Sequence, residues 1–204
     1  MAECGGMPVL ARSIQALAGC DFVQEIVLVT RTEKIGVVGE LAREYGRKKV
    51  SKIVQGGATR VLSSYAGVMS CSKKARLIAI HDGARPLVTE KLILEACWGA
   101  WRHLCAAPAV PVKDTIKYAE NGAVQYTPDR SHLFAVQTPQ VFRADLIRAA
   151  LVRAAETPEV FTDDCSVVEA FGAVVHLTEG DERNLKITTP GDILLAEALL
   201  EGKL

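Results

Sequence analysis

Short apolar runs rich in β-branched residues alternate with longer amphipathic segments through the first half of the chain. The apolar runs, predicted as strands, are residues 25–30, 50–55, 76–82 and 107–112. The amphipathic segments, predicted as helices, are residues 34–46, 59–70 and 89–104. Strands that are apolar on both faces are typical of a mostly parallel sheet covered by helices. The pattern therefore predicts an α/β fold.

The alternation breaks between Asp114 and Gln140. Here the segments TIKY, VQYT and LFAVQT are separated by the polar turns AENGA and PDRS, which is the pattern of hairpin strands rather than of a helical crossover. We therefore predict a β-arm at about residues 114–140 that leaves the body of the protein.

The regular pattern returns after the arm. Residues 143–156 and 163–172 are predicted helices, residues 173–179 and 184–188 are predicted strands, and a closing helix starts at Pro190. Proline suits the first helical turn because its φ is already helical and its missing N–H is not needed there. Thr162 is the predicted N-cap of the helix that follows it. No repeat or linker interrupts the chain, so we expect a single domain over residues 1–204.

The composition excludes several classes of protein. Of 204 residues, 49% are hydrophobic, and 24 basic residues balance 24 acidic ones, so no global field attracts the chain to nucleic acid or to an anionic membrane. The six cysteines form no CxxC pair and no metal-ligand spacing, which indicates reduced thiols and a cytoplasmic protein. Because no apolar run reaches the ~18 residues of a membrane span and no signal peptide is evident, we expect a soluble protein.

One strand end carries a conspicuous set of polar residues. The run LIAI leads directly into His81, Asp82, Gly83 and Arg85, and open α/β sheets bind ligands at the carboxyl ends of their strands. Asp82 can accept hydroxyl groups or face the water shell of a metal, and Arg85 can donate to oxygen acceptors. The alternative is an Asp-Gly turn with a structural ion pair, in which His81 is a hydrogen-bonded residue at the strand end.

Two more places carry charged or hydroxyl side chains. Lys113, Asp114 and Thr115 follow the run APAVPV, where the alternative is a solvated strand terminus. Lys186 lies within the apolar segment NLKIT, where its ammonium can reach a phosphate or can simply point to solvent at a sheet edge.

Glycines follow the run VSKIVQ. Gly56 and Gly57 would let the backbone pass close to a base or ribose, although a plain turn with a helix cap explains them almost as well. Asp163 and Asp164 are interpreted as favourable acids in the first turn of a capped helix, outside any site.

Five segments in this order resemble the 2-C-methyl-D-erythritol 4-phosphate cytidylyltransferase family of the non-mevalonate isoprenoid pathway. They are IHDGARPLV, VPVKDTIK, the DR turn with LFAVQTPQVF, TDDCSVVEAFG and EGDERNLKITTPGD, and the match runs from about Met7 to the C-terminus. The resemblance implies a Rossmann-like, mostly parallel sheet of the nucleotidyltransferase type. It also implies transfer of CMP from CTP to the acceptor phosphate, with release of pyrophosphate and with Mg²⁺ bound beside the triphosphate.

The resemblance assigns roles by position. Asp82, Arg85 and Thr115 match residues that hold the erythritol part of the acceptor, and Lys186 matches the lysine that positions its phosphate. Arg130 matches an arginine that reaches a phosphate across a dimer interface from an exchanged arm, which implies a homodimer with shared sites.

Positions that contact the nucleotide in the family also have counterparts, which are Gly57, Ala58, Ser63 and Gly83. Ala58 stands where an aspartate is common, so a contact there is expected from the backbone alone. The chemistry agrees with a dispersed set of cations, because joining two phosphate groups demands positioning and charge neutralisation rather than a nucleophilic side chain.

The family begins with a strand and a glycine-rich loop whose arginine and lysine wrap the CTP phosphates. This chain starts after them, with counterparts only from about Gly6 and Pro8. Losing such donors typically costs ~10² to 10³ in rate apiece, so we expect the 204-residue chain to be nearly inactive and its natural form to extend upstream. The absent strand lies inside the sheet in the family, so unpaired backbone groups are expected there. Intact mass tests this expectation.

Two rival hypotheses stay open. A ribitol 5-phosphate cytidylyltransferase shares the QTPQ and KIT segments, although VPVKDTIK favours the methylerythritol enzyme. The chain is alternatively a catalytically silent nucleotide-binding relic, because a fold and part of a site can outlive their chemistry.

Overall fold

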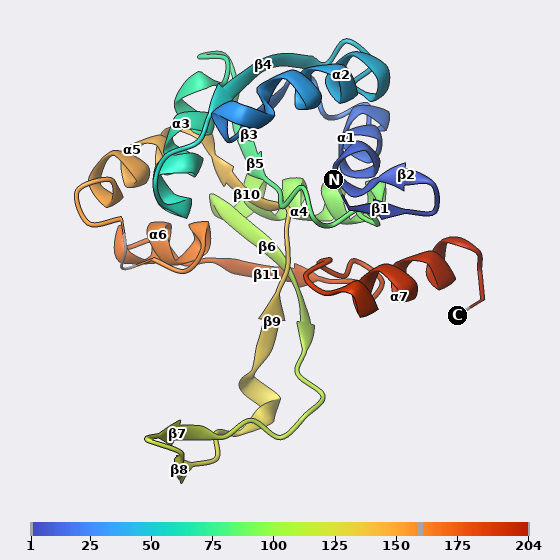
Figure 1. The fold of residues 1–204 in the computed structure, drawn as a ribbon. Helices are drawn as coiled ribbons and strands as arrows, with labels where there is room; N and C mark the ends of the chain where they lie inside the picture. Colours follow the sequence, from blue (N-terminus) through green and yellow to red (C-terminus); the bar gives the residue numbers. More distant parts are fainter. Residues whose placement is uncertain (1, 159–160, 204) are drawn as a thin grey trace.

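The structure is a computed structural model that describes residues 2–158 and 161–203. Its main sheet has the strand order β11 (His176–Glu179), β6 (Cys105–Pro111), β10 (Gln140–Arg143) and β5 (Leu77–Ile80), as seen in Figure 1. Because β10 is antiparallel to both β5 and β6 while β11 is parallel to β6, the other three strands share one direction. A second sheet pairs β3 (Ile26–Thr30) in parallel with β4 (Val50–Gln55). The predicted α/β class is confirmed.

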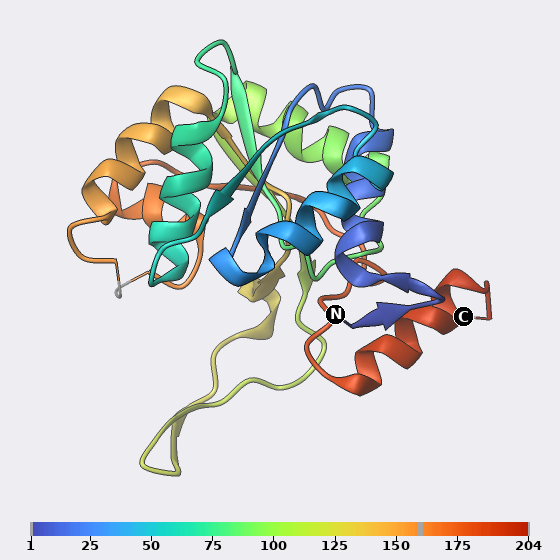
Figure 2. The same cartoon turned by 45° about the horizontal axis from the view of Figure 1, so that its top comes forward.

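Helices cover both faces of the main sheet (Figures 1 and 2). On one face, Phe142 packs into the largest apolar cluster with α3 (Arg60–Ser70), α5 (Ala144–Ala154) and α6 (Asp164–Ala170). On the other face, Val141 packs against α4 (Glu90–His103). Neighbouring residues of β10 therefore bury their side chains on opposite faces, as the period of a strand demands.

The remaining elements surround this core. Helices α1 (Val9–Gly19) and α2 (Ile35–Tyr45) pack against each other, and α2 follows the short 3-10 helix η1 (Thr32–Lys34). A small hairpin of β1 (Glu3–Cys4) and β2 (Met7–Pro8) lies against α7 (Pro190–Leu200), which is visible in Figure 2. As predicted, α7 begins at a proline.

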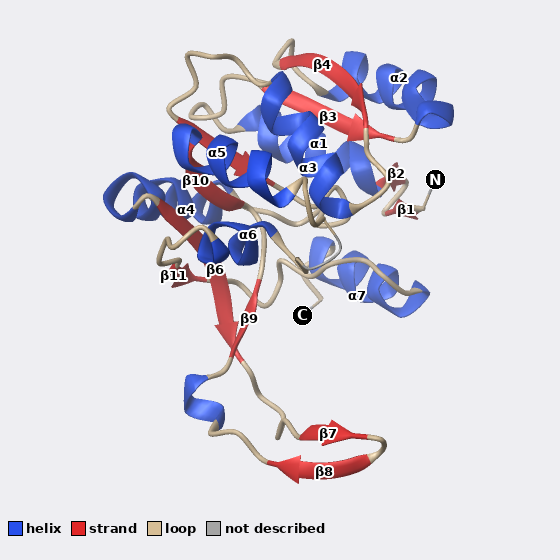
Figure 3. Cartoon of the chain, turned by 90° about the vertical axis from the view of Figure 1, so that its left-hand side faces the viewer, coloured by secondary structure: helices blue, strands red, loops and turns tan. Residues whose placement is uncertain are grey.

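The arm projects away from the body (Figures 1 and 3). It contains a hairpin of β7 (Tyr118–Glu120) and β8 (Ala123–Tyr126), the 3-10 helix η2 (Arg130–His132) and β9 (Phe134–Val136), which returns beside β6. Asn121 and Gly122 form the hairpin turn with φ values of 51° and 80°, which is the left-handed geometry that Asn-Gly favours. The last residues of the predicted range, from Gln137 onward, are buried in the body.

Several local predictions differ from the structure. Strand β10, the hairpin of β1 and β2, and helix α1 were not predicted, and residues 184–188 form an irregular segment instead of a strand. Strand β11 begins only at His176. The N-cap of α6 is Asp163 rather than Thr162, because the Asp163 carboxylate accepts from the Ser166 N–H and the Ser166 hydroxyl closes a capping box.

Two further observations concern the described residues as a whole. Within residues 2–158 and 161–203, β3 pairs with β4 and β5 pairs with β10, and no ladder joins β3 to β5, so the strands form two separate sheets. In the same ranges, no helix is long and apolar enough to cross a membrane. All six cysteines are free.

Candidate active site

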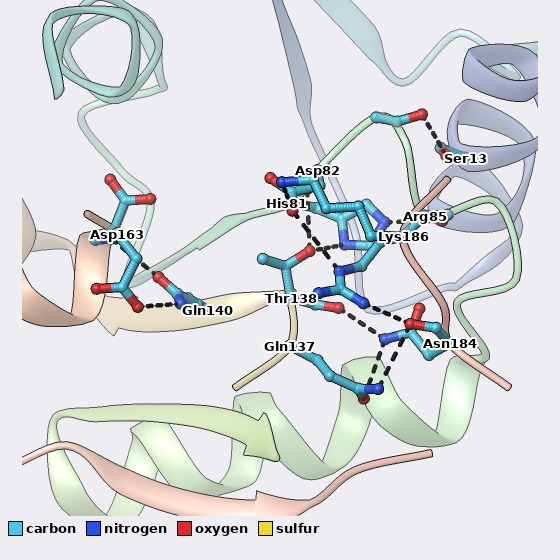
Figure 4. Close-up of polar contacts among 12 residues, drawn as sticks. Ser13, His81, Asp82, Arg85, Gln137, Thr138, Gln140, Asp163, Asn184 and Lys186 are labelled. Atoms are coloured by element: carbon cyan, nitrogen blue, oxygen red, sulfur yellow. Dashed lines mark hydrogen bonds and ion pairs between the residues drawn. The ribbon is translucent and has the colours of Figure 1, made fainter. Parts of the chain in front are cut away.

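The loop after β5 holds a carboxylate between two cations (Figure 4). The Asp82 N–H donates to Thr138 Oγ1 at 3.0 Å, which fixes the start of the loop against the strand segment before β10. The Asp82 Oδ2 lies 3.1 Å from Lys186 Nζ and 3.7 Å from Arg85 Nε. The structure therefore brings together Asp82, Arg85 and Lys186, which are separated by up to about a hundred residues in sequence.

The two cations differ in what they offer to a ligand. The Lys186 side chain is 47% exposed, so its ammonium has donors that face solvent. The Arg85 side chain is only 12% exposed, and its Nη1 donates to the Asn184 carbonyl at 2.6 Å. Burial lowers the pKa of Arg85 and the Asp82 carboxylate opposes the shift, but a guanidinium stays charged in proteins. Arg85 thus also holds the Lys186 segment against the loop.

His81 is a hydrogen-bonded residue at the strand end, as one interpretation of the sequence predicted. Its Nε2 lies 3.2 Å from the Arg85 carbonyl, and its Nδ1 lies 3.0 Å from Thr138 Oγ1. Because a carbonyl can only accept, Nε2 carries the proton and Nδ1 accepts from the Thr138 hydroxyl. Burial lowers the pKa of His81 to about 4, so the ring is neutral at pH 7.

The buried amide side chains of Gln137 and Asn184 hold the segments around the Asp82 loop together. Sequence reasoning assigned these two residues no role. Gln137 Nε2 donates to the Asp181 carbonyl at 2.8 Å, and its Oε1 accepts from the Asp181 N–H at 3.2 Å. Asn184 Nδ2 donates to the Thr138 carbonyl at 3.0 Å. The run QTPQ could have pointed to Gln137, because polar residues stand there where a buried strand continues into VF; Asn184 lies outside this run.

The predicted nucleotide positions form a second group at the start of α3. The Gly57 N–H donates to Ser63 Oγ at 3.1 Å, and the same hydroxyl donates to the Thr59 carbonyl at 2.9 Å. A Cβ on Gly57 would lie 2.3 Å from Leu62 Cβ, so only glycine fits there. Ala58 is exposed in this turn. Gly83 belongs to the Asp82 loop, where its carbonyl accepts from Ser13 Oγ at 3.0 Å.

The predicted arm residues lie apart from both groups within one chain. Thr115 is exposed, and Arg130 is exposed with its Nη1 donating to the Lys113 carbonyl at 2.6 Å. Among the described residues, no hydrogen bond or ion pair joins Thr115 or Arg130 to Asp82, Arg85 or Lys186. The Lys113 ammonium instead pairs with Glu182, beside the loop that leads to Lys186.

Metal-binding groups are sparse in this region. In the part of the chain that the structure describes, no group of three or more His, Cys, Asp or Glu side chains could hold a metal ion. Asp82 is the carboxylate of the cluster, and a single carboxylate with substrate phosphates is a common arrangement for Mg²⁺. The residues therefore fit a magnesium ion that arrives with a nucleotide, not a preformed protein cage.

Comparison with known proteins gives consistent matches over nearly the whole chain. Residues 1–202 match the family model described as "IspD: 2-C-methyl-D-erythritol 4-phosphate cytidylyltransferase". The chain is 45% identical over 197 residues to a 2-C-methyl-D-erythritol 4-phosphate cytidylyltransferase of Caldanaerobacter subterraneus, covering 96% of this chain and 87% of the relative. It is 43% identical over 201 residues to the protein of that name from Halalkalibacterium halodurans, covering 98% and 88%.

Solved structures agree with the sequence matches. A 4-diphosphocytidyl-2C-methyl-D-erythritol synthase from Anaerococcus prevotii superposes with a TM-score of 0.88 at 30% identity, covering 98% of this chain and 88% of that one. A 2-C-methyl-D-erythritol 4-phosphate cytidylyltransferase from Thermus thermophilus superposes with a TM-score of 0.80 at 31% identity, covering 98% and 92%.

The lowered pKa of His81 predicts how stability depends on pH. Between pH 6.5 and about 4 the unfolded chain binds a proton at this histidine and the folded chain does not. The stability contributed by the neutral ring is therefore complete above pH 6.5 and is lost as the pH falls toward 4. In His81→Asn, the free energy of unfolding, measured in urea at several pH values, should decline less steeply across this range.

Gln125, exposed on β8, supplies the control because its amide does not titrate, and Gln125→Asn should keep the pH dependence of the unsubstituted protein. An unchanged slope in His81→Asn would contradict the assignment of a neutral buried ring.

Proposed function

The chain belongs to the 2-C-methyl-D-erythritol 4-phosphate cytidylyltransferase family, and we propose that Asp82, Arg85 and Lys186 form the acceptor side of its active site. It is a cytidylyltransferase that transfers CMP from CTP to 2-C-methyl-D-erythritol 4-phosphate and releases pyrophosphate. The observation that carries the proposal is the cluster itself, in which Lys186 Nζ lies 3.1 Å from Asp82 at the carboxyl end of β5.

The charges of the cluster suit the reaction. An oxygen of the acceptor phosphate attacks the α-phosphorus of CTP, the bond from that phosphorus to the bridging oxygen breaks, and pyrophosphate leaves with the electron pair. Two anions must approach each other, so cations that are already in position lower the barrier. The exposed ammonium of Lys186 positions the acceptor phosphate, and the Asp82 carboxylate accepts hydrogen bonds from the polyol hydroxyls.

Arg85 and Thr115 complete the proposed acceptor side. The guanidinium of Arg85 keeps Asp82 and the Asn184 to Lys186 segment in register, and its remaining N–H groups are the ones available to the polyol. Thr115 is exposed at the base of the arm, where a hydroxyl can reach a neighbouring molecule.

The proposed nucleotide side consists of Gly57, Ala58, Ser63 and Gly83. The close packing of Gly57 on Leu62 lets the backbone of this turn present its own polar groups to a ligand. Ser63 keeps the turn attached to α3 through hydrogen bonds to the backbone on both sides.

Magnesium is part of the proposal as the counter-ion of the triphosphate. The ion would be held chiefly by phosphate oxygens, with the Asp82 carboxylate near its water shell. When bound, Mg²⁺ neutralises phosphate charge that Lys186 and Arg130 alone do not balance.

A homodimer that shares its sites is also proposed, and the exposed arm supports it. The arm presents apolar side chains to solvent, namely Ile116, Tyr118, Val124, Tyr126, Phe134 and Val136. A two-stranded hairpin is at best marginally stable alone, so a second copy that covers these side chains would stabilise it. Arg130 lies on the same arm and would reach the acceptor or nucleotide phosphate of the partner chain.

The comparisons do not favour the two rival hypotheses. The relatives reported above are named 2-C-methyl-D-erythritol 4-phosphate cytidylyltransferase, a name that fits neither a ribitol phosphate enzyme nor a silent relic. A cytoplasmic location is also proposed, and it rests on the six free thiols of the chain.

The first prediction of this proposal concerns substrate choice. The protein with CTP and Mg²⁺ should release pyrophosphate when 2-C-methyl-D-erythritol 4-phosphate is added and should turn over ribitol 5-phosphate far more slowly. A coupled pyrophosphate assay measures both rates. Preference for ribitol 5-phosphate, or CTP binding without any turnover, would overturn the proposed acceptor.

Removal of the exposed ammonium should cost activity with little cost in folding. We expect Lys186→Ala to lower kcat/KM by about 10² to 10³, because it deletes a charge that acts on the reacting phosphate. Steady-state kinetics and a thermal unfolding curve measure the two effects. Lys91→Ala is the matched control, since Lys91, on α4, forms an exposed pair with Glu179 of β11, and it should keep full activity. A loss below about threefold in Lys186→Ala would exclude the proposed role.

Complementation between two inactive variants tests the shared site. An Arg130→Ala chain and an Asp82→Ala chain should each be inactive as homodimers, but a mixed dimer contains one intact site. Random mixing in equal amounts should restore about a quarter of the unsubstituted activity, since half of the dimers are mixed and each has one intact site of two. If mixed dimers form, as detected by native mass spectrometry, and activity does not return, Arg130 acts within its own chain.

A further inference from the structure

An ion pair with a buried carboxylate joins two helices that flank the candidate site. Arg60 is the first residue of α3 and Asp164 is the first residue of α6. The Arg60 Nη2 lies 2.6 Å from the Asp164 Oδ2; the aspartate side chain is 0% exposed, whereas the arginine side chain is 36% exposed. A fully buried carboxylate is costly unless a charged partner lies beside it, so this contact is a specific feature of the fold and not a chance surface pair.

The Asp164 end of the pair is fixed to β10 by the side chain of Gln140. Gln140 Oε1 accepts from the N–H groups of Asp164 and Cys165, each at 3.1 Å. Gln140 Nε2 donates to Asp163 Oδ2 at 2.7 Å. Two N–H donors require the amide oxygen and a carboxylate requires the amide nitrogen, so the orientation of Gln140 is determined by its partners.

From Gln140 the connection continues to the acceptor cluster. Gln140 is separated by one residue from Thr138, whose hydroxyl accepts from the Asp82 N–H at 3.0 Å. Figure 4 includes Asp163, Gln140, Thr138 and Asp82 in one view. The position of α6 is thereby tied to the loop that holds Asp82.

The Arg60 end of the pair is tied to the proposed nucleotide turn. Arg60 follows Thr59 directly, and Ser63, one turn further along α3, hydrogen bonds to the Gly57 N–H and to the Thr59 carbonyl. Movement of the first turn of α3 therefore moves Gly57 and its neighbours as well. No other ion pair between described residues joins α3 to α6.

We propose that the Arg60–Asp164 pair is a positioning pair that sets the nucleotide turn at Gly57 against the acceptor loop at Asp82. This inference rests on the proposed function of those two segments. Neither Arg60 nor Asp164 needs to touch a substrate, because the pair acts through the first turn of α3 on one side and through Gln140 and Thr138 on the other. The Asp82 loop is also held by its contacts with Thr138 and Lys186, whereas the Gly57 turn is held through the first turn of α3. Loss of the pair should therefore affect the KM for CTP most.

The physics of buried charges supplies a test that separates positioning from stability. Replacing a buried ion pair by apolar residues often leaves stability unchanged or raises it, whereas removing one partner leaves a buried charge uncompensated. The double variant Arg60→Met with Asp164→Leu should then fold stably but lose the directional contact. The single variant Asp164→Asn keeps the shape of the side chain and removes its charge.

In both variants, KM for CTP should rise about tenfold while KM for the acceptor changes by less than about twofold, with rates normalised to the folded fraction. Asp145→Asn is the matched control, because Asp145 lies in the first turn of α5 as an exposed acid beside Arg143. It should leave all kinetic constants unchanged.

The outcomes distinguish the inference from the function it depends on. The unsubstituted protein is assayed first, and failure to transfer CMP there would overturn the proposed function itself. If the unsubstituted protein is active and a stably folded double variant keeps its KM for CTP, the positioning role is excluded while the proposed function stands. Equal increases of the KM values for CTP and for the acceptor, or a loss of kcat that only follows the folded fraction, would indicate that the pair is purely structural. Either result would also exclude the positioning role.

Discussion

Both groups of candidate site residues depend on the antiparallel strand β10, which lies between β5 and β6. In this pairing Gln140 is opposite Ile80, and continuing the register by two residues brings Thr138 opposite Asp82. The hydrogen bond from the Asp82 N–H to the side-chain Oγ1 of Thr138 therefore lies just beyond the last backbone pair of the ladder. A slip of one residue would turn Phe142 from the main apolar cluster to the opposite face, so the packing of the core and the geometry of the site are set by one register.

The two cations of the acceptor cluster have different roles: Arg85 mainly holds the fold, and Lys186 faces the ligand. The guanidinium of Arg85 contacts the Asn184 carbonyl and the Asp82 carboxylate, and the Ile187 N–H donates to the Ala84 carbonyl at 2.8 Å. These contacts hold the irregular segment around Lys186 without a regular strand ladder. The ammonium of Lys186 can then stay exposed on a backbone that is fixed on both sides, which is the preorganisation that charge neutralisation requires.

The sequence predicted those elements that follow a simple period. The helices from α2 to α5 and the strands β3 to β6 have clear apolar patterns, and the Asn-Gly turn marked the hairpin of the arm. Strand β10 was missed because it is short, follows Pro139 directly and inserts antiparallel between β5 and β6, which share one direction. That Asp82, Arg85 and Lys186 lie close together was predicted from the position of Asp82 and Arg85 at the end of a strand and from the family resemblance, which also included Lys186. Arg130 cannot be placed near them from one chain, because its proposed contact lies on a second copy. Thr115 is exposed at the base of the arm, and its predicted contact with the acceptor stays a prediction.

The connection between the two halves of the site is polar, and this has a physical consequence. Apolar side chains such as those around Phe142 pack tightly but accept small shifts, because dispersion contacts have little directional preference. The amide of Gln140 and the pair of Arg60 with Asp164 act in fixed directions and at fixed distances. Phosphoryl transfer needs its reacting groups aligned to within a fraction of an ångström, so a polar connection across the sheet transmits position better than packing alone. Burying the Asp164 carboxylate carries a desolvation cost. In return, the pair holds the Gly57 turn and the Asp82 loop, which lie on different elements, in one geometry.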